Sequence, residues 1–77
     1  MNNVCSGHEL KAAEYAQRAA LNYKKAVEYN DSGNIEMALH HALLAATELD
    51  HSSQHAKKVT DFYVKTIIDN MFEFLDD

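Results

Sequence analysis

The chain has 77 residues and a formal net charge of -5, from 12 acidic and 7 basic residues. A chain of this length forms one small domain and buries only roughly 60–65% of the surface that its unfolded form exposes. Its single cysteine excludes an internal disulfide, and its acidic surplus disfavours nucleic acid as a partner. No window of about 18 apolar residues and no basic, apolar leader occurs, so we expect a cytoplasmic protein with no membrane segment.

The chain contains no proline and two glycines, a composition typical of an all-α fold with long helices. Residues 1–5 are predicted to be a flexible tail, in which Cys5 is an unreactive free thiol. Ser6 and Glu9 have the spacing of a capping box, which predicts that a helix over about 7–30 begins here. At about 100° per residue, one face of this helix is rich in alanine and is predicted to pack inward: Ala12, Tyr15, Ala16, Ala19, Ala20, Tyr23, Ala26 and Val27.

A turn is predicted over residues 30–34, where Gly33 suits a left-handed position and Asn34 can cap a second helix over about 35–49. A second turn is predicted over residues 50–53, with Asp50 or a serine capping a third helix over about 53–75. No glycine or proline enforces this turn, so one continuous helix is the alternative. The sequence predicts an antiparallel three-helix bundle, with residues 6–77 as a single domain.

The first two predicted helices carry small, aromatic and glycine residues at the spacing of a tetratricopeptide unit: Ala26, Tyr29, Gly33, Ala38 and Ala45. This hairpin resembles a single such unit. Asn22, Lys25, Ala42 and Asp50 depart from the motif, and solenoids need about three units. The resemblance implies a closely packed helical hairpin and, as one alternative function, an adaptor that binds a partner helix.

Alanine, glutamate and histidine recur in short blocks between Ala12 and Ala56, including Ala12-Ala13-Glu14, His40-His41-Ala42 and His55-Ala56. Over this range the chain resembles small Ala/His-rich helical proteins of bacteria. It departs from them at Tyr15, Tyr23 and Tyr29, where such sequences favour histidine. The resemblance implies a bacterial helical bundle with no assigned activity.

Glu48, His51 and His55 are the candidate metal ligands. If the helix continues through Asp50, these side chains share one side, and imidazoles four residues apart can bind zinc, copper or nickel. The competing interpretation, which is the commoner outcome for such a set, is that they are solvated surface side chains. No catalytic motif occurs, so neither an enzyme nor an obligatory cofactor is expected.

The last predicted helix carries more apolar residues than a three-helix core can cover. Contiguous exposed apolar surface usually marks an interface, which predicts association, as a homodimer or with a partner protein. The candidate interface residues are Ile68, Met71, Phe72, Phe74, Leu75, Leu44 and Met37. The leading functional prediction is a small non-enzymatic interaction or structural module that self-associates through the end of this helix. The alternatives are the metal-binding protein and the adaptor.

Overall fold

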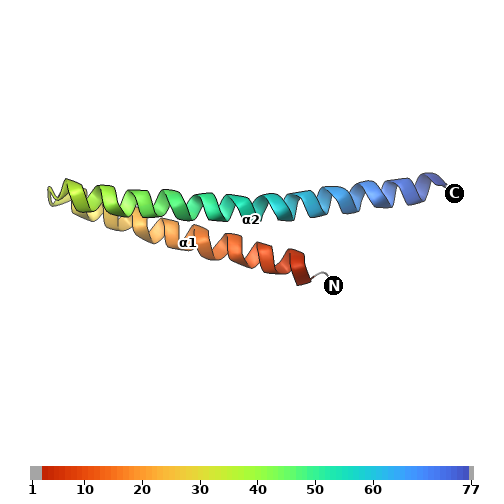
Figure 1. Cartoon of the computed structure of the whole chain (residues 1–77), viewed down its shortest axis with the longest axis horizontal. Coiled ribbons are helices and arrows are strands. Elements are labelled where there is room, and N and C mark those ends of the chain that lie inside the picture. The colour runs from red at the N-terminus through yellow and green to blue at the C-terminus, as the bar shows by residue number, and fades with distance from the viewer. Residues whose placement is uncertain (1–2, 77) are drawn as a thin grey trace.

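The computed structural model describes the backbone of residues 3–76 and the side chains of residues 5–73. Two helices, α1 (Asn3–Asp31) and α2 (Ile35–Asp76), form an elongated antiparallel hairpin (Figure 1). Its Cα atoms extend over 67 × 19 × 13 Å. With 42 residues against 29, α2 continues past the start of α1. We call residues 64–76 of α2 the overhang.

The predicted three-helix bundle is wrong, because the chain does not turn at residues 50–53. The residues expected to cap a third helix have other partners. Asp50 accepts a hydrogen bond from Gln54 one turn later, at 3.0 Å, while Ser52 donates to the carbonyl of Ala12 in α1, at 2.7 Å. Since neither side chain caps a new helix and no glycine or proline interrupts α2, the two predicted helices are one continuous rod.

The start of α1 also differs from the prediction. The helix already includes residues 3–5, which the sequence analysis placed in a flexible tail. Glu9 does not complete a capping box with Ser6, because its carboxylate accepts hydrogen bonds from the Cys5 thiol and from the hydroxyl of Tyr63 in α2. The pair therefore lies inside the helix instead of marking its beginning.

The predicted turn around Gly33 is confirmed. Gly33 has φ +83°, a left-handed conformation that glycine adopts without a steric penalty. The Asn34 amide donates to the Tyr29 carbonyl and the Gly33 amide to the Asn30 carbonyl, which is the Schellman pattern of helix termination. The Asn34 side chain then accepts a hydrogen bond from the Met37 amide, so that Asn34 caps α2.

The contact between the helices is a single stripe on each, which we call the seam. Its members are spaced alternately three and four residues apart, the 3.5-residue repeat of a coiled coil. In α1 they are Cys5, His8, Ala12, Tyr15, Ala19, Asn22, Ala26 and Tyr29, and in α2 they are Ala38, His41, Ala45, Glu48, Ser52, His55, Val59 and Phe62. All of these residues are buried or half-buried.

Smaller residues occupy every second seam position, which recurs every seven residues, and larger, mostly polar residues occupy the others. This alternation lets the two backbones approach closely, as the hydrogen bond from Ser52 to the Ala12 backbone shows. The buried volume is correspondingly small. Among the described side chains only Cys5, Ala19 and Ala45 are buried, and none of them is large.

Most of the large apolar side chains lie outside the seam. Tyr23 and Val27, which the sequence analysis placed on the packed face of the first helix, are 42% and 58% exposed. The large apolar side chains that remain exposed are Leu10, Leu21, Tyr23, Val27, Ile35, Leu39, Leu43, Leu44, Leu49, Tyr63, Val64, Ile67, Ile68, Met71 and Phe72. The fully buried positions of the hairpin are therefore small, while most of its large apolar side chains remain exposed.

Candidate functional site

The middle of the seam is a polar network centred on Asn22. The Asn22 amide nitrogen donates to the Glu48 carboxylate at 2.5 Å and to the Arg18 carbonyl at 3.2 Å. The amide oxygen pairs with Nδ1 of His41 at 2.9 Å, and because this oxygen can only accept, Nδ1 carries the proton. The His41 ring also stacks on Tyr29, at 5.4 Å between centroids. These directional contacts favour one register of α1 against α2.

Histidines from both helices meet nearer the open end of the hairpin. Nδ1 of His8 lies 2.7 Å from Nδ1 of His55, so one ring donates and the other accepts. Tyr15 lies against both His51 and His55, with ring centroids 5.1 and 5.8 Å away. Burial lowers the pKa of His55, and the neighbouring His8, Lys58, Lys11 and His51 lower this pKa further. The cluster therefore favours a neutral His55.

Cys5, Glu9 and Tyr63 form a hydrogen-bonded group at the open end. The Cys5 thiol donates to Glu9 at 3.3 Å, and the Tyr63 hydroxyl donates to the same carboxylate oxygen. Burial and the Glu9 contact raise the pKa of Cys5, which agrees with the expected unreactive thiol. The hydrogen bonds from Tyr63 and then Cys5 lower the pKa of Glu9. This group ties the first turns of α1 to α2.

The predicted metal ligands do not gather at one point. Glu48 accepts the hydrogen bond of Asn22, whereas His51 lies against Tyr15 and His55 against both Tyr15 and His8. Among the described residues, no group of three or more His, Cys, Asp or Glu side chains is placed to hold a metal ion. The basic neighbours Lys11 and Lys58 further disfavour a bound cation near His55.

An open apolar groove of about 420 Å³ lies at the closed end of the hairpin, near the turn. Both helices line it, through Tyr23, Ala26, Val27, Asn30, Ile35, Ala38, Leu39 and Ala42. The lining contains no histidine, carboxylate or basic side chain. The groove can therefore accept an apolar side chain or helix but offers no group for acid–base or nucleophilic chemistry.

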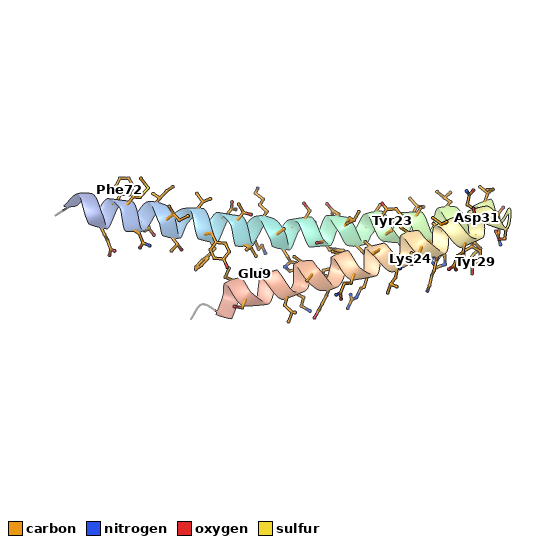
Figure 2. The ribbon with its side chains drawn as sticks, turned by 180° about the vertical axis from the view of Figure 1, so that it is seen from behind. Glu9, Tyr23, Lys24, Tyr29, Asp31 and Phe72 are labelled. Carbon is orange, nitrogen blue, oxygen red and sulfur yellow. The ribbon has the colours of Figure 1, made fainter. Side chains whose placement is uncertain are left out.

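Four of the predicted interface residues have described side chains that are exposed: Leu44, Ile68, Met71 and Phe72. Ile68, Met71 and Phe72 lie on the overhang, 44–62% exposed, and Phe72 projects from it well past Glu9 at the open end (Figure 2). Leu44 is exposed and Met37 half-buried. The side chains of Phe74 and Leu75 lie outside the described residues.

Several residues that organise the hairpin, above all His8 and Asn22, were not among the predicted site residues. Their signal is the regular alternation of three- and four-residue steps from Cys5 to Tyr29, which is visible in the sequence once polar residues are admitted to the inward face. The five residues of the tetratricopeptide-like spacing all lie in the seam or the turn. That spacing therefore coincides with close helix packing in this chain.

Comparisons of the chain with protein-family models, with curated proteins and with solved structures find no match. Over the residues that the structure describes, neither helix is long and apolar enough to cross a lipid bilayer.

Proposed function

We propose that the chain is a non-enzymatic helical interaction module that completes its fold by associating with a second copy of itself. One observation carries this proposal: only three small side chains are buried among the described residues, while fifteen large apolar side chains are exposed. Ordering each residue costs about 1–2 kcal/mol of conformational free energy, which so little burial does not offset. An associating copy supplies the missing burial.

The overhang is part of this association. It continues past α1, so Ile68, Met71 and Phe72 have no packing partner from the other helix and remain exposed. A contiguous apolar patch of this kind marks an interface in most soluble proteins. The apolar lining of the groove, which offers no catalytic groups, supports an interaction role over an enzymatic one.

Coupling between folding and association is tested by thermal unfolding at several chain concentrations. If two copies stabilise one another, the temperature at which half of the helical signal is lost, the midpoint, rises with the chain concentration. Ile67→Asp places a charge on the overhang, where Ile67 is exposed, and is expected to lower this midpoint. A midpoint that is independent of concentration over a hundredfold range, with full helicity at the lowest concentration, would contradict the proposal.

A further inference from the structure

One face of the hairpin carries no charged residue over residues 13–30 of α1 and 35–70 of α2, and Glu9, at the open end, is the one charged residue described in its repeat. We call this surface the uncharged face. Its members repeat at three- and four-residue steps beside the seam: Ala13, Ala16, Ala20, Tyr23, Val27 and Asn30 in α1, and Ile35, Leu39, Ala42, Ala46, Leu49, Ser53, Ala56, Thr60, Tyr63, Ile67 and Asn70 in α2. All are exposed except Ala42, which is half-buried. Charged residues make up 25% of the chain, so their exclusion from this face requires an explanation.

Two contacts show that both helices turn these residues to the same side. At the closed end, one groove is lined by Tyr23 and Val27 from α1 and by Ile35 and Leu39 from α2. At the open end, Tyr63 donates to Glu9, which continues the same repeat in α1. The face is therefore continuous across the hairpin.

The opposite side of the hairpin contrasts with this face, because charges are spread along it. Lys11, Arg18 and Lys25 recur every seven residues in α1, and Lys58 and Lys65 do so in α2. Met37, Leu44 and Phe72 belong to the same repeat as these two α2 lysines. Three of the seven candidate interface residues from the sequence thus lie on the charged side, and the uncharged face is a second and more extensive apolar surface.

We infer that the uncharged face is the docking surface for a second copy, with the two hairpins antiparallel to each other. This inference rests on the proposed self-association and specifies its geometry. Apart from Glu9, whose carboxylate accepts hydrogen bonds from Tyr63 and Cys5, this face carries no charge and is complementary to an identical face, whereas a charged partner would lose hydration there without a compensating ion pair. From Ile35 to Ile67 the face is about 48 Å long at 1.5 Å per residue, and the hairpin is 19 Å wide.

The area of this face suits a stable dimer. Its length and the 19 Å extent of the Cα atoms give an upper limit of roughly 900 Å², and each partner in a specific complex buries about 800 Å². Alanines at positions such as Ala16, Ala20 and Ala46 allow the second hairpin to approach closely. Two hairpins packed in this way form a four-helix arrangement in which the large apolar side chains of the uncharged face lie between the layers: Tyr23, Val27, Ile35, Leu39, Leu49, Tyr63 and Ile67.

The shape of the hairpin favours the antiparallel orientation. The groove is concave and lies at the closed end. The overhang, at the other end, is a single helix (Figure 1) and carries large exposed apolar side chains such as Ile67. Antiparallel copies place each overhang against the other copy's groove, so that Ile67 approaches Leu39 of the second copy. Parallel copies would instead face groove with groove, leaving unfilled space.

Cysteine crosslinking tests this orientation. Leu39→Cys and Ile67→Cys are made separately in a Cys5→Ala chain, and each variant is treated with a short bis-maleimide, alone and after mixing. Within one chain the two positions are about 42 Å apart along a continuous helix, so they cannot crosslink to each other internally. We expect a covalent dimer from the mixture and little from either variant alone. A dimer from Leu39→Cys alone would overturn the antiparallel arrangement.

A charge-insertion pair provides a second readout in the otherwise unmodified chain. Leu39 on the uncharged face and Leu21 on the opposite side are 58% and 60% exposed, so both tolerate glutamate in the isolated hairpin. We expect Leu39→Glu to raise the dimer dissociation constant about 100-fold or more, because its carboxylate would be buried without a partner, and Leu21→Glu to change it less than about threefold. An unmodified chain that is dimeric, with both variants equally dimeric and the mixture not crosslinked, would refute this surface but not self-association. A monomeric unmodified chain would refute both.

Discussion

The seam and the uncharged face run side by side along the hairpin, yet they differ in almost every property. The seam combines small residues with polar ones such as Asn22 and His41, and its members are buried or half-buried. The uncharged face carries large apolar residues such as Leu39 and Ile67, and these are exposed. The comparison suggests a division of roles, in which hydrogen bonds in the seam fix the register of the helices and the uncharged face supplies the apolar area for association.

The largest expected loss of stability follows from replacing a seam alanine with a larger residue. Ala45 is fully buried, so Ala45→Leu forces the helices apart and should reduce the free energy of unfolding by about 1–3 kcal/mol. Thr47→Leu introduces the same side chain at an exposed position and should stay within about 0.5 kcal/mol of the unmodified chain. Urea unfolding followed by circular dichroism, at one fixed concentration, measures both. Equal stability of the two variants would show that the seam is not closely packed.

The turn at Gly33 sets the register of α1 against α2, and both the seam and the uncharged face depend on this register. Gly33 is left-handed with open space around it, so Gly33→Ala should cost roughly 1–2 kcal/mol through backbone strain alone. Gly7 lies inside α1, also in open space, and Gly7→Ala should stabilise the helix by about 0.5–1 kcal/mol. Urea unfolding followed by circular dichroism measures these two opposite changes in the free energy of unfolding. A stabilising Gly33→Ala would contradict the left-handed turn.

Two adjacent serines lie on different surfaces, Ser52 in the seam and Ser53 on the uncharged face. Ser52→Ala removes the hydrogen bond to the Ala12 carbonyl and should cost about 1 kcal/mol. Ser53→Ala, one residue later on the exposed face, should change stability by less than about 0.5 kcal/mol. Thermal unfolding of the two variants side by side distinguishes them. A larger loss from Ser53→Ala would mean that α2 is rotated relative to the seam described above.

The smallest expected effect is a dependence on pH from the histidine cluster. Because the folded hairpin lowers the pKa of His55 below its ordinary 6.5, the unfolded chain binds this proton more readily. The contribution of His55 to stability is therefore fully present above about pH 6.5 and is lost as the pH falls through that value. The thermal midpoint should be lower at about pH 5.5, where most carboxylates are still charged, than at about pH 7.5.

His55→Gln should reduce this pH dependence, and His40→Gln, at an exposed position, should leave it intact. An unchanged pH dependence in His55→Gln would assign the effect to another group.

The sequence predicted the helical class and the turn at Gly33 and Asn34, because glycine and asparagine at a helix end have few alternative roles. It failed at residues 50–53, since Asp50 and Ser52 can cap a helix but also bond within or between helices, and only the tertiary fold decides. The inward face was misassigned for a related reason. Counting at 3.6 residues per turn grouped Tyr23 and Val27 with Ala19, whereas the 3.5-residue repeat of the hairpin places Asn22 inside and those two residues outside.

We propose that the large apolar side chains of the uncharged face are covered by a second copy of the chain. Sedimentation equilibrium of the unmodified chain measures this most directly. We predict a mass twice the 8.7 kDa of one chain at micromolar concentration, with helicity that falls as the dimer dissociates on dilution. A mass of 8.7 kDa at every concentration, with undiminished helicity, would contradict the claim.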